Sequence, residues 1–476
     1  MSACVNFAII NRYNLSTLMR ITFCGANQEV TGSCYYIETA HANIVLDCGM
    51  FQGGKYAEDK NNQPFPFPVE SVHAVVVTHA HFDHTGRLPK LYKDGFRGIL
   101  WATTPTAELS MVTLRDSVHL MKDEAERHDK EPLYTEQEVE PLEALWRTIP
   151  YHKDREIAPG VFIYLTDAGH ILGSASIRVR ADGQQVVFSG DLGNSPVPLL
   201  HNLENQDGAD VVIIESTYGN RVHEPSSQRY PVLRDAINDA VKNNGVLMIP
   251  AFALERTQEL LYELHHLRMK NEIPAVPIFL DSPMAISATE IFEEHVDFFN
   301  TEAQHDLQKD SEFFKFKGLT FTKDSTESKA IFNVKGAKVI VAGSGMMNGG
   351  RILHHLKNYL GQKNTILLII GFQVEGSLGR RLHDHEKNVM IYGQDVHVEA
   401  DVRSFGAFSG HADYPRLMNW LNGFQHTPPR KVFVTHGELN AALAFSQSIE
   451  DQLGVASGVP QFGEMIDVAH LGHPHS

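Results

Sequence analysis

Short apolar runs, each followed by a polar or glycine-containing turn, make up most of residues 20–210. The run Ala74–Val77 is typical of them, because it is β-branched and ends in a polar segment. Runs of this length and composition predict β-strands. The predicted strands are 21–24, 35–38, 43–47, 74–78, 99–102, 161–165, 177–180 and 186–189. One longer stretch, 105–126, predicts a polar helix between them.

The pattern changes after Tyr218 to longer units in which a buried strand precedes a helix. Residues 245–250 predict such a strand, and 254–269 carry apolar residues at helical spacing. Strands alternating with helices predict a parallel sheet covered on both faces. From about Asp395 the earlier pattern returns, so we predict an α/β domain interrupted by a second one. The predicted divisions are 1–18, an N-terminal extension; 19–215 and 395–476, the two parts of the first domain; and 216–394, the inserted domain.

Length and composition agree with a two-domain protein. A chain of 476 residues exceeds the size at which one hydrophobic core keeps growing, and a 42% hydrophobic share is ordinary for a globular protein. No apolar run reaches the roughly 18 residues of a membrane span, so no membrane association is predicted. The four cysteines form no CxxC pair, which favours a reducing compartment and a cytoplasmic location. Residues 1–18 do not resemble a secretory signal, and we expect them to be dispensable or a misassigned start.

The net charge of −17 is unusual for a protein that binds a polyanion. A nucleic-acid-binding domain is expected to carry a basic surface. The overall sign does not decide the question, because the local field around a cleft governs the steering of a ligand. The charge therefore argues only against tight, nonspecific binding of a nucleic acid.

Candidate chemistry is concentrated in the segment Thr78–Gly86, directly after a predicted strand. It carries three imidazoles and a carboxylate: His79, His81, Asp83 and His84. Neutral imidazole nitrogens and carboxylates are ligands that Zn²⁺ prefers. Alternate residues at a strand end face the same way, so His79 and His81 can share one ion and the later pair can reach a second. The alternative is a solvated histidine-rich loop.

Three further candidates also follow predicted strands: His170, Asp191 and His436. Each stands beside a glycine, which lets the backbone turn tightly at a metal. Alone, each would more often be a turn residue or a buried histidine. Asp47 has the same context and is predicted to hold a ligand histidine in place. Among these candidates it is also the one best explained as a carboxylate that only caps a loop.

With these segments the chain resembles the metallo-β-lactamase superfamily, whose hallmark is His-x-His-x-Asp-His. More narrowly, it is similar to the β-CASP branch of metal-dependent nucleases, which includes the endonuclease of the cleavage and polyadenylation specificity factor. The resemblance implies an αββα sandwich with an inserted parallel α/β domain. It assigns motif A to Glu215, motif B to His411 and motif C to His436, where histidine is typical of members acting on RNA.

The predicted reaction is hydrolysis of RNA phosphodiester bonds by two Zn²⁺ ions. One ion would take His79, His81 and His170, and the other Asp83, His84 and His436, with Asp191 between them. His411 would protonate the leaving oxygen, and Glu215 would orient its ring. Attack by water would leave a 5′-phosphate and a 3′-hydroxyl. We expect an endonuclease and leave exonuclease activity and a homodimer open.

Substrate contacts are expected from the insertion. The segment Gly343–Arg351 follows a strand and opens a helix, so Ser344, Gly345 and Arg351 are predicted to hold the phosphate backbone. Ordinary helix starts look similar. Phe252 and Arg256 are weaker candidates for base stacking and phosphate contact, the alternative being a buried aromatic ring and a surface arginine.

Two pairs of histidines on predicted helices, 265–266 and 354–355, are interpreted as solvated. Two other functions remain open on the sequence. The first is a hydrolase of a small thioester or lactam with the same metal site, which would leave the insertion of roughly 180 residues without an explanation. The second is a non-catalytic subunit that binds RNA or protein, against which the complete set of ligands argues.

Overall fold

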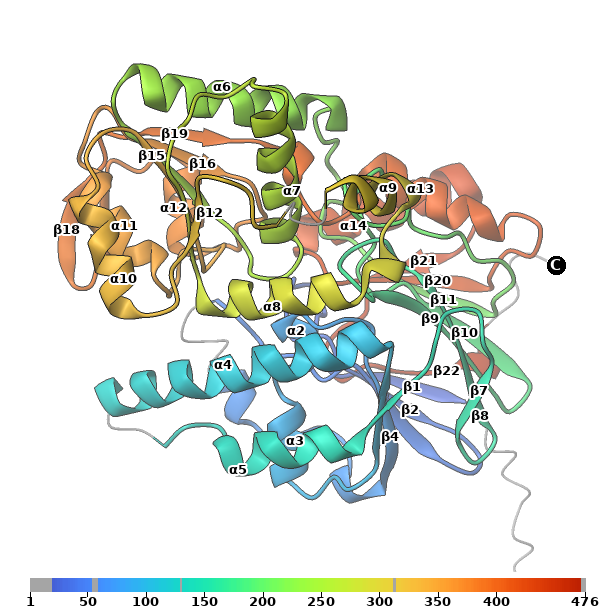
Figure 1. The fold of residues 1–476 in the computed structure, drawn as a ribbon. Helices are drawn as coiled ribbons and strands as arrows, with labels where there is room; N and C mark the ends of the chain where they lie inside the picture. The colour runs from blue at the N-terminus through green and yellow to red at the C-terminus, as the bar shows by residue number, and fades with distance from the viewer. Residues whose placement is uncertain (1–18, 54–58, 129–130, 311–313, 472–476) are drawn as a thin grey trace, which may run out of the picture.

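The computed structural model describes residues 19–53, 59–128, 131–310 and 314–471 (Figure 1). The predicted extension, residues 1–18, lies outside this range. The described residues form two seven-stranded sheets, one six-stranded sheet and a β-hairpin. No helix among them is both long and apolar enough to cross a lipid bilayer.

The first sheet contains the strands nearest the N-terminus and one from the other end of the chain. Its order is β22 (Met465–Asp467), β1 (Arg20–Phe23), β2 (Tyr35–Glu38), β3 (Asn43–Leu46), β4 (Val72–Val76), β5 (Ile99–Ala102) and β6 (Trp146–Thr148). Strands β3 to β6 pair in parallel, while β22, β1, β2 and β3 pair antiparallel. β22 therefore joins the last part of the chain to the first strand.

The second sheet likewise combines early and late segments. Its order is β21 (Ser457–Gly458), β20 (Lys431–Thr435), β11 (Val211–Glu215), β10 (Gln184–Phe188), β9 (Ala175–Ala181), β8 (Val161–Asp167) and β7 (Arg155–Ala158). The two sheets face each other across one core, to which Phe23 and Ile177 contribute from opposite sides. The polar ends of β4, β8, β10, β11 and β20 follow this core, which is how the fold gathers the candidate ligands.

Helices cover the outer faces of both sheets. The first sheet carries α2 (Phe82–Thr85), α3 (Leu88–Lys93), α4 (Thr104–His128) and α5 (Glu136–Val139), and the second carries α13 (Tyr414–Leu421) and α14 (Leu439–Leu453). The side chain of Asp413 caps α13 by accepting a hydrogen bond from the backbone of Arg416. Gly454 ends α14 in the left-handed conformation, with φ of 66°. These layers are the predicted αββα sandwich.

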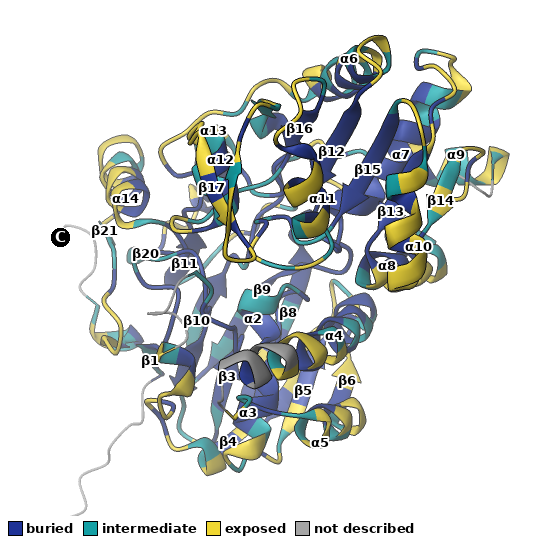
Figure 2. Cartoon of the chain, turned by 90° about the vertical axis from the view of Figure 1, so that its left-hand side faces the viewer, coloured by how far each residue is buried: buried dark blue, intermediate teal, exposed yellow. Residues whose placement is uncertain are grey.

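The inserted domain is a six-stranded sheet in which all neighbours are parallel. Its order is β14 (Leu319–Phe321), β13 (Ile278–Asp281), β15 (Lys338–Ala342), β12 (Val246–Pro250), β16 (Ile366–Ile369) and β19 (Asp401–Ser404). Its strands are buried between two layers of helices whose outer faces are exposed (Figure 2). The prediction of an α/β fold with an inserted parallel domain is confirmed.

One layer of helices covers one face of the insertion sheet, and the core beneath it continues into the first domain. It contains α6 (Arg229–Lys242), α7 (Arg256–Met269), α8 (Pro283–Glu294) and α9 (Thr301–Lys309). The other layer contains α10 (Ser325–Ala330), α11 (Ile352–Tyr359) and α12 (Leu378–His383), beside the hairpin β17 (Asn388–Ile391) and β18 (Gln394–His397). Helix α8 packs on α4, which ties the insertion to the first domain (Figure 1).

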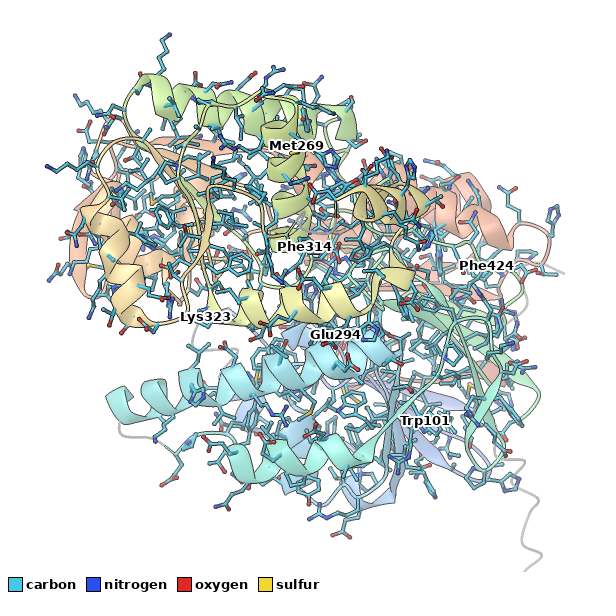
Figure 3. The ribbon with its side chains drawn as sticks, in the orientation of Figure 1. Trp101, Met269, Glu294, Phe314, Lys323 and Phe424 are labelled. Carbon is cyan, nitrogen blue, oxygen red and sulfur yellow. The ribbon has the colours of Figure 1, made fainter. Side chains whose placement is uncertain are left out.

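Three residues labelled in Figure 3 mark separate cores: Phe314 in the insertion, Trp101 between the two large sheets, and Phe424 under α13. The boundary expected at residue 394 does not coincide with the end of the insertion sheet. β19 lies beyond this boundary and pairs in parallel with β16. Its four residues form the last strand of the insertion sheet before the chain re-enters the first domain.

Candidate metal centre

The loops after the strand ends meet at one edge of the two facing sheets. They bring together all seven predicted ligands: His79, His81, Asp83, His84, His170, Asp191 and His436. The close approach of the loops depends on glycine. A Cβ atom at Gly193 would lie 1.7 Å from the carbonyl oxygen of Gly169, so only glycine lets these two loops touch. Gly193 also forms an isolated bridge with His411.

The first group of donors consists of three histidines around one point. The Nδ1 atom of His81 lies 3.1 Å from Nε2 of His79 and 3.1 Å from Nε2 of His170. The Oδ2 atom of Asp191 lies 3.4 Å from Nε2 of His79 and 3.6 Å from Nε2 of His170. Four donor atoms from three loops therefore converge.

The second group lies on the other side of Asp191. The Nε2 atoms of His84 and His436 are 3.2 Å apart, and Nε2 of His436 is 3.4 Å from Oδ2 of Asp83. The other oxygen of Asp191, Oδ1, lies 3.4 Å from Nε2 of His84 and 3.7 Å from Nε2 of His436. Each oxygen of this one carboxylate therefore faces a different group of donors.

The donor set fits divalent transition-metal ions. Zn–N bonds of about 2.0–2.1 Å in a tetrahedron separate two nitrogens by roughly 3.3–3.4 Å, close to the distances within each group. Burial holds the pKa of His79 and His170 well below the usual range and lowers that of His81 to about 4, which keeps these rings neutral. Oδ1 of Asp191 has no hydrogen-bond partner among the described residues, although it is buried. A buried carboxylate oxygen without a hydrogen-bond donor is costly unless a cation binds it.

Outer hydrogen bonds fix the ring of His84. Its Nδ1 atom lies 2.7 Å from Oδ2 of Asp47, the position predicted to support a ligand. Asp47 in turn accepts from the backbone N–H of Thr78 at 2.8 Å. Burial lowers the pKa of His84, but the carboxylates of Asp191 and Asp47 outweigh it and raise that pKa well above the usual range. Support of this kind orients a metal-binding imidazole.

The remaining rings have outer partners that the sequence did not reveal. Nδ1 of His170 lies 3.0 Å from the carbonyl oxygen of Gly410, and Nδ1 of His436 lies 3.2 Å from the hydroxyl of Thr217. Asp47 and His436 both adopt positive φ, 55° and 49°, which is uncommon away from glycine and recurs at functional sites. In the sequence, the only hint of the partners Gly410 and Thr217 is their position close to the motif residues His411 and Glu215.

A histidine–glutamate pair flanks the metal-ligand groups. Nδ1 of His411 lies 3.2 Å from each carboxylate oxygen of Glu215, and Glu215 is held by the backbone N–H of Leu192 at 2.7 Å. Burial lowers the pKa of His411, but the carboxylates of Glu215 and Asp191 outweigh it and raise the pKa to about 9. The ring can therefore carry a proton beside the metal groups.

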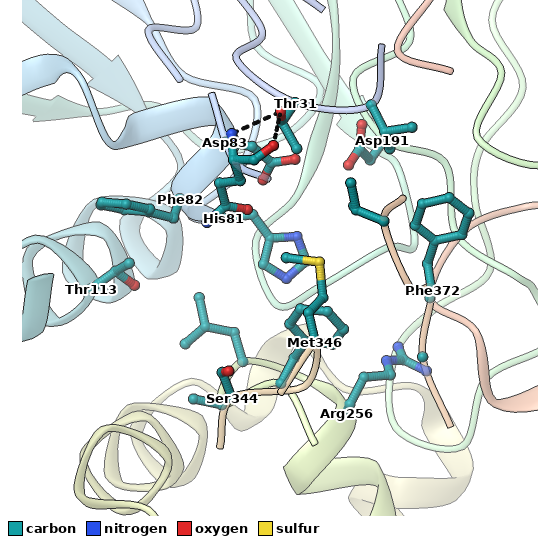
Figure 4. Close-up of a pocket in the computed structure, with 18 of the residues that line it drawn as sticks. Thr31, His81, Phe82, Asp83, Thr113, Asp191, Arg256, Ser344, Met346 and Phe372 are labelled. Atoms are coloured by element: carbon teal, nitrogen blue, oxygen red, sulfur yellow. Dashed lines mark hydrogen bonds between the residues drawn. The ribbon is translucent and has the colours of Figure 1, made fainter. Parts of the chain in front are cut away.

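A cavity of about 270 Å³ opens beside the centre (Figure 4). His81 projects into it, and Met346, Ser344, Arg256 and Phe372 stand around it. Of the predicted substrate residues, Ser344, Phe252 and Arg256 line the cavity. Gly345 lies under the ring of Phe252, where a Cβ atom would come within 2.7 Å. The insertion thus supplies one wall of the cavity.

The predicted phosphate contact of Arg351 is not supported, because this side chain does not line the cavity. Its guanidinium donates to Asp281 and to the backbone carbonyls of Thr322 and Lys323. The alternative of a surface arginine at position 256 is wrong, since Arg256 is buried and pairs with Glu259.

The interpretation of the two histidine pairs as solvated is wrong for one member of each. His265 and His355 are buried, because the apolar stripe of each helix turns these rings toward the insertion core.

Family comparisons agree with the geometry. Residues 28–220 match the metallo-beta-lactamase superfamily, 257–382 the Beta-Casp domain, and 395–460 the Zn-dependent metallo-hydrolase RNA specificity domain. The centre and fold therefore define a metal-dependent hydrolase. The Ribonuclease TTHA0252 of Thermus thermophilus is 37% identical over 94% of this chain and 100% of its own.

Two archaeal relatives are more distant. The RNase J-like protein of Methanocaldococcus jannaschii is 30% identical over 95% of this chain and 100% of its own, and the transcription termination factor FttA of Methanosarcina mazei is 32% identical over 92% and 70%. A solved structure of an Enterococcus faecalis protein of unknown function shares the fold, with a TM-score of 0.54 at 12% identity over 94% of this chain and 99% of that one. This chain belongs to the β-CASP branch of the metallo-β-lactamase superfamily, which confirms the family predicted from its motifs.

Proposed function

We propose that this chain is a two-zinc ribonuclease that cuts RNA internally and leaves a 5′-phosphate and a 3′-hydroxyl. The observation that carries the proposal is the division of Asp191 between two groups of donors, with Oδ2 toward His79 and His170 and Oδ1 toward His84 and His436. A carboxylate shared in this way is what a pair of neighbouring ions requires.

His79, His81, His170 and Asp191 would hold one ion, and Asp83, His84, His436 and Asp191 the other. When bound, two such ions polarise the phosphoryl oxygens and lower the pKa of water from 15.7 toward about 7. The protein's part is to keep the three rings of the first group neutral. Two of them are oriented by hydrogen bonds, His79 through Thr78 and His170 through the carbonyl oxygen of Gly410.

His411 would donate the proton that the leaving 3′-oxygen needs. Glu215 keeps the ring oriented and charged, since it accepts from Nδ1 and leaves Nε2 as the donor toward substrate. A general acid of this kind contributes about 10²–10⁴-fold to the rate. Asp191, 3.8 Å from Nδ1, adds a second negative charge that favours the protonated ring.

RNA as the substrate rests on the relatives and on the matched domains. One relative is named a ribonuclease, another RNase J-like, and the C-terminal match is described as an RNA specificity domain. The insertion supports the same proposal against a small lactam or thioester, because it adds a whole domain over the centre. A non-catalytic role is disfavoured by the complete set of convergent donors.

The test is a cleavage assay on zinc-loaded full-length protein with circular RNA, linear RNA, single-stranded DNA and a chromogenic lactam. We expect cutting of the circular and linear RNA, ligatable 5′-phosphate ends, and no turnover of the lactam. The matched control is His411→Ala, loaded identically. Inactivity on both RNAs, or hydrolysis of the lactam alone, would overturn the proposal. Cutting of linear but not circular RNA would overturn its endonuclease part.

A further inference from the structure

Beyond the metal-ligand groups and His411, the cavity beside the metal centre has few charged side chains. Asp83 and Asp191 belong to the two donor groups. Arg256 is 5% exposed, and its guanidinium donates to Glu259 and to the carbonyl oxygen of Phe408. Apart from the histidines, the remaining charged side chain in the described lining is Asp116. Outside the metal-ligand groups and His411, the lining therefore offers a phosphate little positive charge beyond the buried guanidinium of Arg256.

The walls favour a flat, largely apolar ligand. Phe82 and Leu120 lie on the side of the first domain, and Phe252, Met284 and Met346 on the side of the insertion. The ring of Phe252 lies 6.3 Å from that of His81, so an aromatic wall stands next to the metal ligands. Aromatic and thioether groups are surfaces on which single-stranded RNA bases stack, whatever the sequence.

Asp116 lies on α4 and is half-buried in the wall of this cavity. It makes no hydrogen bond or ion pair with any other described residue. Its neighbours do not satisfy it, because the hydroxyl of Thr113 donates to the carbonyl of Leu109 at 3.0 Å and that of Ser117 to Leu114 at 2.6 Å. Burial also raises the pKa of Asp116, with His119 as the weaker opposing influence. The cavity therefore presents a carboxylate with both oxygens available.

We propose that this cavity binds a nucleobase adjoining the scissile phosphate and that Asp116 reads the edge of that base, selecting guanine. The inference rests on the proposed ribonuclease function and names the base that the site prefers. It assigns Asp116 as a specificity-determining residue.

The preference follows from matching donors and acceptors. A carboxylate offers two acceptors and no donor, and guanine alone presents two adjacent donors, N1–H and the N2 amino group, on its Watson–Crick edge. Adenine and cytosine each present one donor beside an acceptor, so one carboxylate oxygen would face a lone pair. Uracil places its single donor between two acceptors. These edges are open in single-stranded RNA.

The experiment is cleavage of a linear RNA library with randomised sequence, followed by sequencing of both new ends. The zinc-loaded wild type should enrich guanine by about fivefold or more at one position near the cut. Asp116→Asn presents a donor beside an acceptor, so it should lose this enrichment and gain adenine or cytosine at the same position. Asp207→Asn, on an exposed aspartate outside the cavity, removes the same charge and should behave as the wild type.

Hydrolysis of bis(p-nitrophenyl) phosphate separates the two proposals, because this small diester has no nucleobase. A library that is cut without base preference, or with a preference that Asp116→Asn leaves unchanged, would overturn the assignment of Asp116 while the ribonuclease proposal stands. A wild type that hydrolyses the small diester but cuts no RNA would overturn the ribonuclease proposal itself.

Discussion

Two buried aspartates, Asp191 in the metal centre and Asp281 in the insertion, have similar surroundings and opposite properties. Asp191 follows the buried strand β10, and Asp281 is the last residue of the buried strand β13. Both are at most 2% exposed, and both contact histidine. Asp281 is fully satisfied, since Oδ1 accepts from Thr322 and Arg351 and Oδ2 from Ser328 and His355. Oδ1 of Asp191 accepts no hydrogen bond among the described residues, while several histidine nitrogens point toward the carboxylate.

Residue type and burial alone therefore do not distinguish a metal-binding carboxylate from a structural one. A closed set of hydrogen bonds leaves no lone pair for a cation, so Asp281 stabilises the insertion. Lone pairs that converge without donors are costly unless an ion binds them. Mutations of these carboxylates and of their partners test this distinction between a metal ligand and a structural carboxylate.

The largest effect is expected from Asp191→Ala. Removing the shared carboxylate takes one donor from each group, so metal content and activity should both fall, and activity by more than the 10²–10⁴-fold that a general acid supplies. Elemental analysis of purified protein measures the metal per chain. Two zincs per chain in the variant would contradict the bridging role.

His411→Ala should separate chemistry from metal binding. The ring is not in either of the two ligand groups, so we expect full metal content with a kcat lower by about 10²–10⁴-fold. Steady-state kinetics on RNA, with metal analysis of the same sample, provide the measurement. Unchanged turnover would exclude His411 from the mechanism.

Asp281→Ala should affect stability and spare the centre. Removal of this carboxylate leaves the buried ring of His355 and the partly exposed guanidinium of Arg351 without their acceptor, which costs about 3–5 kcal/mol of unfolding free energy. Denaturant titration measures this loss. Metal content per folded chain should match the wild type, and a variant that loses metal as Asp191→Ala does would show that the two aspartates do not differ as described.

A third buried carboxylate, Glu263 on α7, belongs neither to a metal-ligand group nor to a closed set of hydrogen bonds. Its Oε2 atom has no hydrogen-bond partner among the described residues. Burial raises its pKa to about 8, against the opposing charge of Arg229. The folded state therefore favours the protonated form, and this stability is lost as pH rises from about 4.5 to 8.

Glu263→Gln is neutral throughout this range, so it should avoid that loss. Relative to the wild type, its unfolding free energy should rise by about 1–4 kcal/mol between pH 5 and pH 8.5. Denaturant titrations at the two pH values measure the change. Glu290→Gln, on an exposed position of α8, is the control. Equal pH dependence in wild type and Glu263→Gln would contradict the prediction.

The smallest effect is expected from Arg351→Ala. Because the guanidinium donates to Asp281 and two carbonyls, its loss should lower stability by about 1–3 kcal/mol. KM for RNA and the salt dependence of binding should stay at wild-type values. A higher KM with a flatter salt dependence would restore the phosphate contact predicted from the sequence.

The sequence predicted the fold well because its strands are short, apolar and followed by glycine-containing turns. The seven candidate ligands were also visible, since His79 to His84 are adjacent and the others stand at equivalent strand ends. What the sequence could not give was pairing over long separations. His355 meets Asp281 across 74 residues, and Arg351 meets it across 70, so helical position alone did not reveal this shared partner.

Asp116 was missed for a different reason. It lies in a polar stretch of α4, and nothing in its neighbours marks it as facing a cavity. That cavity forms only when the insertion packs on α4 through α8, so its character depends on residues more than a hundred positions away. Apolar walls next to a metal centre are a property of the assembled domains.

The order of the strands also bears on how the molecule comes into being. His436, which faces Asp83, and β22, which closes the first sheet against β1, both come from the final segment of the chain. During synthesis, domains fold as units from the N-terminus. The nascent polypeptide therefore cannot complete its second donor group until residue 436 has left the ribosome. Under the proposed mechanism, the growing chain therefore lacks a complete second donor group for most of its own translation, while it is still attached beside its messenger.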